Sequence, residues 1–163
     1  MRQLPDTISN LDRAVHVHLP ADFTAFCLLH GHHYLHYARV RLKDPGISKA
    51  VVERALGDIA TAWPRALGSP APAAFGWRSL SARVAGALVR TPATTDHAQD
   101  SMHRLLRAAE ADAVICHRLM DLSVRDTASL LGVGAETVNQ RLSAAADNLG
   151  TELAHLFGLR AAP

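Results

Sequence analysis

Apolar residues recur every three or four positions along most of this chain, which is the spacing of amphipathic helices. The pattern predicts a long helix over residues 22–42, a break at 44–46 and a second helix over about 47–62. We expect Asp22 to cap the first helix and Pro64 to end or kink the second. Both segments are therefore predicted to be helices with one apolar side.

Two segments without helical periodicity interrupt the chain, and the second of them divides it into two parts. Residues 68–76, GSPAPAAFG, are predicted to form a loop, and a third helix follows over about 77–90. Residues 91–100, TPATTDHAQD, show no apolar periodicity, and we interpret them as an interdomain linker. The chain is therefore expected to form two small helical domains, 1–90 and 101–163.

The second half contains two short helical segments separated by a glycine-rich turn. Ser123, followed three residues later by Asp126, predicts a capped helix start, and Gly132 predicts its end. Gly134 then precedes the next helix. Two helices joined by such a three-residue turn are typical of a helix-turn-helix. The helices predicted for this half cover 101–109, 110–120, 124–131 and 135–155.

The composition favours an all-α protein, because aromatic residues make up only 5% of the chain whereas alanine and leucine abound. No apolar run reaches the roughly 18 residues that a membrane span needs. The first twenty residues lack the apolar core and cleavage site of a signal peptide, so we expect a cytoplasmic location. No nucleophile elbow, phosphate-binding glycine loop or His-Glu-x-x-His motif occurs, so neither an enzymatic activity nor a cofactor is predicted.

The histidine-rich stretch HGHHYLH is the main candidate for metal chemistry. His32 and His36 lie one helical turn apart, as do His33 and His36, so a divalent ion could bridge a pair. A closed zinc site needs four ligands, which one helix rarely supplies, so no metal site is predicted and a metal-responsive switch is the weakest hypothesis. Cys27 and Cys116 are far apart and are expected to be buried, reduced thiols.

Residues 119–142, LMDLSVRDTASLLGVGAETVNQRL, resemble region 4 of extracytoplasmic-function sigma factors, the small subunits that direct bacterial RNA polymerase to promoters. The family has a Leu-Ser before the first helix of the motif, then an acidic residue and a small-residue stretch ending in Leu-Gly. Its recognition helix has a Thr-Val pair followed by Arg-Leu. The matching residues here are Leu122, Ser123, Asp126, Ala128, Leu131, Gly132, Thr137, Val138, Arg141 and Leu142.

The first half is similar to region 2 of the same family. Residues 34–39, YLHYAR, fall where the family has a Leu-Leu-Arg-Tyr-Ala-Arg type of helix, and Asp44-Pro45 falls at its usual turn. Phe75 and Trp77 fall at its promoter-contacting segment, which the helix containing Ser81, Ala82, Arg83 and Val84 follows. The resemblance implies RNA polymerase core and promoter DNA as partners. It implies a docking helix with partner-binding residues Lys49, Val51, Val52, Glu53 and Arg54.

Charge is distributed unevenly along the chain. Residues 1–109 carry 13 Lys plus Arg against 8 Asp plus Glu, whereas residues 110–163 carry 4 against 7. The half with the predicted DNA reader is therefore acidic, and affinity for duplex DNA comes largely from neutralised phosphates. We predict that this chain binds duplex DNA only when a larger complex, such as the polymerase, holds it in place.

The predicted recognition helix nevertheless carries groups that can read bases. Asn139 and Gln140 can pair with adenine. Glu136 can accept from cytosine, and the Thr137 methyl group suits thymine. The candidates for phosphate contacts are Arg125 and Arg141 in the second half and Arg78, Arg83 and Arg90 in the first.

Two functions follow from these patterns. The first is a sigma-factor-like regulator of transcription initiation that docks on RNA polymerase and recognises promoter DNA. The alternative is a degenerate sigma-like protein that binds a regulatory protein, such as an anti-sigma factor, without selecting promoters. The docking helix motivates the alternative, because Lys49 and Arg54 place cations where the family carries an acidic-amide pattern around the paired valines.

Overall fold

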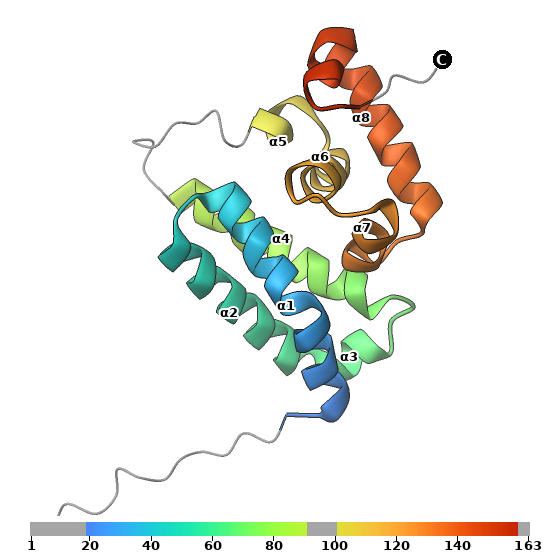
Figure 1. The fold of residues 1–163 in the computed structure, drawn as a ribbon. Coiled ribbons are helices and arrows are strands. Elements are labelled where there is room, and N and C mark those ends of the chain that lie inside the picture. The colour runs from blue at the N-terminus through green and yellow to red at the C-terminus, as the bar shows by residue number, and fades with distance from the viewer. Residues whose placement is uncertain (1–18, 91–100, 160–163) are drawn as a thin grey trace, which may run out of the picture.

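The computed structural model describes residues 19–90 and 101–159, and those residues form helices and short connections without any strand (Figure 1). The all-α prediction is thus confirmed for this part of the chain. The predicted linker, 91–100, lies outside the described residues. The helices are α1 (Ala21–Leu42), α2 (Pro45–Thr61), α3 (Trp63–Leu67), α4 (Pro72–Arg90), α5 (Ser101–Leu105), α6 (Ala108–Val114), the π-helical turn η2 (Ile115–Leu119), α7 (Val124–Leu131) and α8 (Ala135–Leu156).

The start of α1 differs from the prediction, because Pro20 and not Asp22 occupies the capping position. Asp22 lies in the first turn, where a negative charge suits the positive end of the helix. Its carboxylate accepts a hydrogen bond from the Phe23 amide at 2.8 Å and from Trp63 Nε1 at 3.1 Å. Asp22 therefore ties α1 to α3 and does not cap α1.

The predicted loop at 68–76 is shorter than expected, since α4 begins at Pro72. Proline suits the first helical position because it has no amide hydrogen to leave unpaired, and the two alanines that follow favour helix. Pro64 does mark a boundary, as predicted. The helix α2 ends at Thr61, and Pro64 lies in the first turn of α3.

The predicted start and end of the helix over 124–131 are confirmed by α7. The Ser123 hydroxyl accepts from the Asp126 amide at 3.0 Å, and Gly132 ends the helix in the left-handed conformation with φ of 67°. Gly134 then caps α8. The predicted helix over 135–155 is interrupted, because Gly150 has φ of 72° and ψ of 165° and bends the chain away from the helix axis.

An aromatic core holds the first half together. The rings of Phe26 and Trp63 lie 5.2 Å apart, and those of Tyr37 and Trp77 lie 4.6 Å apart. Gly76 of α4 allows α1 to approach closely, because a Cβ atom there would lie 2.5 Å from both Phe26 Cζ and Tyr34 Oη. Aromatic packing across α1, α3 and α4 therefore sets the geometry of the N-terminal half (α1–α4).

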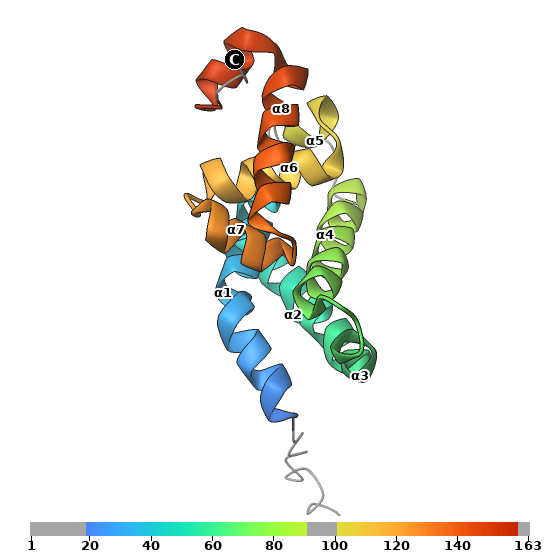
Figure 2. The same cartoon turned by 90° about the vertical axis from the view of Figure 1, so that its right-hand side faces the viewer.

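The C-terminal half (α5–α8) is built on three packed segments: α6 with η2, α7 and the first part of α8 (Figure 2). Val114, Leu130 and Val138 are each at most 1% exposed at the centre of this packing. Both views show these segments seated against α4 and α1. Because one cluster of buried side chains runs through both halves, the halves share a continuous core.

Candidate nucleic-acid interface

The helices α7 and α8, joined by the turn at 132–134, form a helix-turn-helix. Val138 is completely buried and anchors α8, whereas Glu136, Asn139 and Gln140 are exposed. Gln140 Nε2 lies 3.5 Å from Glu136 Oε1, the long limit of a hydrogen bond, so these polar groups remain available. The face predicted to read bases is therefore accessible even though the two halves are packed together.

Cations are scarce around this face. Arg125 and Arg141 are the sole Lys or Arg residues between positions 124 and 156 of the sequence. Arg125 is exposed on α7, whereas Arg141 is half-buried, as is Thr137. The structure thus places Arg141 at the edge of the face and not at its centre.

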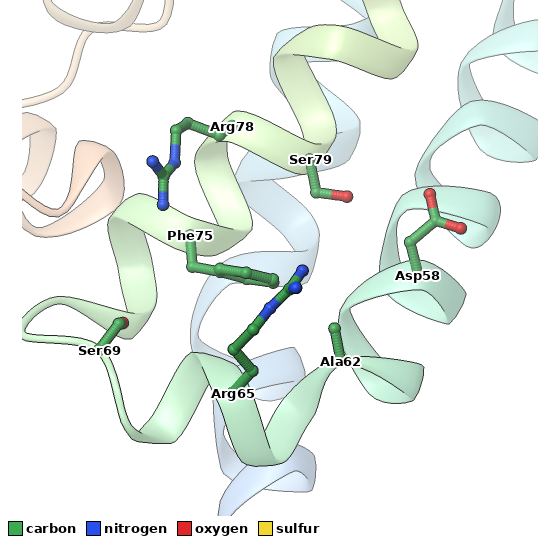
Figure 3. A pocket seen from close by; sticks show the side chains of 7 residues that line it. All are labelled: Asp58, Ala62, Arg65, Ser69, Phe75, Arg78 and Ser79. Carbon is green, nitrogen blue, oxygen red and sulfur yellow. The ribbon is translucent and has the colours of Figure 1, made fainter.

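A cleft between α2 and α4 collects a different set of charges (Figure 3). This α2–α4 cleft has a volume of about 620 Å³. The guanidinium of Arg65 lies 5.7 Å from the centre of the Phe75 ring, close enough for a cation–π contact. The lining residues are Asp58, Ala62, Arg65, Ser69, Phe75, Arg78 and Ser79.

The net charge of the α2–α4 cleft is positive. Asp58 is neutralised by Arg83, whose Nε and Nη2 donate to its two carboxylate oxygens at 2.7 and 2.8 Å. Arg65 and Arg78 have no ion-pair or hydrogen-bond partner for their guanidinium groups among residues 19–90 and 101–159. The cleft therefore combines two available cations with one aromatic ring.

The three arginines of α4 that were predicted to contact phosphates, Arg78, Arg83 and Arg90, differ in their surroundings. Arg83 is engaged by Asp58 and is less available to a phosphate. Arg90 lies three helical turns beyond Arg78, roughly 18 Å along α4. Arg65 was missed by the sequence analysis, and the one signal for it is that Arg65 and Phe75 flank the same short loop.

The residues of α2 that were predicted to bind a partner divide into two groups. Val51 and Val52 are 4% and 6% exposed and pack in the core, so their side chains do not reach the surface in this structure. Lys49, Glu53 and Arg54 are exposed, and Lys49 Nζ lies 3.8 Å from Glu53 Oε1. A partner of α2 would therefore contact a mixed-charge surface and not the valine pair.

The histidine stretch lies on α1. His30 is buried against Phe26, whereas the rings of His32 and His33 lie 3.6 Å apart nearer the surface. No group of three His, Cys, Asp or Glu residues that could hold a metal is found in the described ranges. Cys116 is buried and Cys27 half-buried, both as free thiols, and burial raises the pKa of each.

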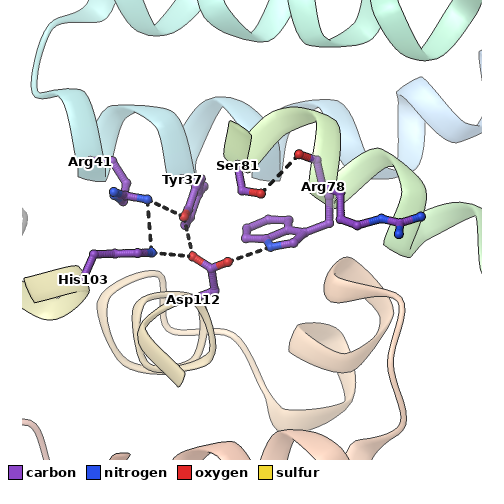
Figure 4. A network of polar contacts seen from close by, with 7 residues as sticks. Tyr37, Arg41, Arg78, Ser81, His103 and Asp112 are labelled. Carbon is purple, nitrogen blue, oxygen red and sulfur yellow. Dashed lines mark hydrogen bonds and ion pairs between the residues drawn. The ribbon is translucent and has the colours of Figure 1, made fainter. Parts of the chain in front are cut away.

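A buried polar network crosses from one half to the other (Figure 4). Asp112 of α6 accepts hydrogen bonds from the Tyr37 hydroxyl at 2.5 Å and from Trp77 Nε1 at 2.9 Å. His103 Nε2 lies 2.9 Å from the same carboxylate, and buried Arg41 donates to the Tyr37 hydroxyl at 2.8 Å. Because Asp112 satisfies donors from α1 and α4, this network specifies how the two halves pack.

Comparison with family models, with curated proteins and with solved structures found no match to this chain. Every helix in 19–90 and 101–159 is too short or too polar to cross a bilayer. The described residues form an all-helical fold with a helix-turn-helix in the C-terminal half and an arginine-lined cleft in the N-terminal half.

Proposed function

We propose that this chain is a sigma-factor-like regulator of transcription initiation, which docks on RNA polymerase and recognises promoter DNA. The observation that carries the proposal is the presence of two complementary surfaces in one molecule. One surface is the exposed polar face of α8, and the other is the α2–α4 cleft. The first suits the base edges of a duplex, and the second suits an unpaired strand.

The α2–α4 cleft supports single-strand binding through two kinds of group. The half-buried ring of Phe75 can stack on an unpaired base, and such stacking tolerates any base sequence. Arg65 and Arg78 can neutralise the phosphates on either side of that base. In this role the cleft contacts the melted part of a promoter.

The face of α8 supports duplex reading. Asn139 and Gln140 present amide groups that can pair with an adenine in the major groove. With Arg125 and Arg141 as the nearest cations, about two phosphates can be neutralised, so intrinsic affinity for a duplex is low. RNA polymerase would deliver this helix to its site and raise its effective concentration there.

Reconstituted transcription tests the proposal. The purified chain, combined with core polymerase on upstream fragments of its own operon, is expected to form an open complex. Phe75→Ala should reduce open-complex formation by about tenfold or more, because one stacking contact is lost. Arg39→Gln removes an exposed cation of α1 outside the cleft and serves as the matched control.

A second candidate is a sigma-like protein that binds a regulatory protein without selecting promoters. It is favoured by Leu28 and Leu29 on α1, which are 78% and 60% exposed. Large apolar side chains gathered on a surface are typical of protein interfaces. Failure to open any fragment, combined with tight binding of an anti-sigma-type protein that Leu28→Asp abolishes, would favour this candidate over the first.

A further inference from the structure

A second cleft lies at the junction of the two halves. This junction cleft has a volume of about 480 Å³, within the usual range of small-molecule sites. Its walls come from the loop before α4, from α4 itself, from α6 and from the helix-turn-helix. It therefore exists only while the halves are packed together.

Two cations line the junction cleft from opposite halves. Arg78 projects from α4 and Arg141 from α8. Neither guanidinium has a hydrogen-bond or ion-pair partner among the residues that the structure describes. Two unpaired guanidinium groups facing one cleft favour an anion, and the three terminal oxygens of a phosphate can accept hydrogen bonds from both groups at once.

The acidic residue of the junction cleft does not cancel this charge. The carboxylate of Asp112 already accepts from Tyr37 and Trp77 and lies beside His103. Its oxygens are therefore directed into the polar network, which also contains the cation of Arg41. The positive charge of Arg78 and Arg141 remains available to a ligand.

The rest of the junction cleft is apolar. Ala71, Ala74, Leu131 and Val133 contribute hydrocarbon walls. Trp77 is only 6% exposed and its indole nitrogen is bonded to Asp112, so it offers no free face for a base to stack on. The cleft thus lacks the stacking surface that a nucleic-acid strand uses and suits a compact apolar body.

We propose that the junction cleft binds a small organic phosphate, with the phosphate held by Arg78 and Arg141 and an apolar or aromatic body against the alanine and aliphatic walls. Such a ligand contacts both halves. It therefore binds the packed arrangement in preference to any separated one and stabilises it by mass action. The site is distinct from the α2–α4 cleft, although Arg78 borders both.

Calorimetric titration of the full chain with phenyl phosphate and with inorganic phosphate tests the proposal. Phenyl phosphate is expected to bind more tightly, and it should raise the unfolding temperature. Arg78→Gln and Arg141→Gln should each weaken its binding by about tenfold or more, because a charge-assisted contact is lost. Arg141→Lys should give an intermediate affinity, and Arg39→Gln should leave the affinity unchanged.

Arg65→Gln distinguishes the two clefts, because Arg65 borders only the α2–α4 cleft. If Arg65→Gln weakens phenyl phosphate binding and Arg141→Gln does not, the ligand lies in the α2–α4 cleft and the proposal is overturned. The absence of phenyl phosphate binding at millimolar concentration would also overturn it. Binding of a short oligothymidine through Arg141, in place of phenyl phosphate, would assign the cleft to a nucleic-acid strand instead.

Discussion

At the scale of single residues, His30 shows how packing changes the chemistry of a side chain. Its ring lies 4.6 Å from that of Phe26 and 5.9 Å from that of Tyr34, and the residue is 5% exposed. Burial lowers the pKa of His30, and the neighbouring His33 and His32 lower it further. His30 is therefore a neutral core residue near neutral pH.

Acidification is expected to destabilise the protein through His30. The pKa of His30 is lower in the folded state than the unfolded value of about 6.5. Its contribution to the free energy of unfolding is therefore complete above about pH 6.5. The contribution is lost as the pH falls through 6.5 (about the unfolded pKa) toward the folded pKa. Urea unfolding across this range should show a shallower loss of stability in His30→Phe than in the wild-type chain.

The control for this experiment is His155→Gln, which changes an exposed histidine of α8. Burial and the neighbouring His32 also lower the pKa of His33, and Asp126 across the junction partly opposes that shift. His33 is present in both proteins. An identical pH dependence in His30→Phe and wild type would contradict the assignment.

At the scale of elements, α8 has one buried side and one exposed polar side. Val138 and Ala145 are fully buried against the rest of the C-terminal half. Asn139 and Gln140 lie on the exposed side, held in helical geometry by that packing. A site on a rigid helix positions its amide groups more reproducibly than a loop would.

Asn139→Ala and Gln140→Ala are each expected to change promoter preference by about 1–3 kcal/mol, because a bidentate contact to one base is lost. The measurement is competition between promoters that differ by single base pairs, with the chain bound to polymerase. Glu152→Gln, on the exposed surface beyond Gly150, is the control. Unchanged preference in both alanine variants would show that α8 does not read bases.

At the scale of the whole molecule, the contact between α4 and the helix-turn-helix depends on Gly132. A Cβ atom at this glycine would lie 2.1 Å from the Ala74 backbone nitrogen and 2.8 Å from the Ala73 carbonyl carbon. The same residue ends α7 with φ of 67°. One glycine therefore both turns the chain and lets the two halves touch.

Gly132→Ala should lower the free energy of unfolding by more than about 2 kcal/mol, since left-handed strain and a backbone clash act together. Gly158→Ala is the matched control. It has φ of 61°, and its nearest atom beyond its chain neighbours, Arg118 Nη1, would lie 3.8 Å from a Cβ atom. It should lose only about 1 kcal/mol, from backbone strain alone. Equal losses of unfolding free energy for Gly132→Ala and Gly158→Ala in chemical denaturation would show that the contact between α4 and the helix-turn-helix contributes nothing to stability.

The buried polar network around Asp112 also stabilises the packing of the two halves. Asp112→Asn leaves one acceptor oxygen among donors from three elements, so a loss on the order of 3 kcal/mol is expected in denaturant unfolding. The exposed Asp147→Asn should stay within about 0.5 kcal/mol of wild type. If Asp112→Asn lowers the free energy of unfolding as little as Asp147→Asn does, water satisfies the hydrogen-bond donors around Asp112 in place of the carboxylate.

Local patterns predicted much of the fold. Ser123 and Gly132 marked the ends of α7 correctly, because capping and left-handed turns depend on a few adjacent residues. The start of α4 was placed too late, since two prolines and two glycines within 68–76 were interpreted as loop. Pro72 instead begins a helix. Proline is compatible both with a loop and with the first position of a helix, so the residues next to it do not fix where the helix begins.

The sequence alone determined the helical class, the helix-turn-helix pattern and the polar face of α8, because periodicity and capping are properties of neighbouring residues. Only the tertiary structure decided that Asp112 joins the two halves, that Arg65 meets Phe75, and that Arg78 and Arg141 share a cleft. The residue pairs that make these contacts are separated by 10 to 75 positions in the numbering of the chain. Their proximity follows from how the helices pack, which no short stretch of sequence encodes.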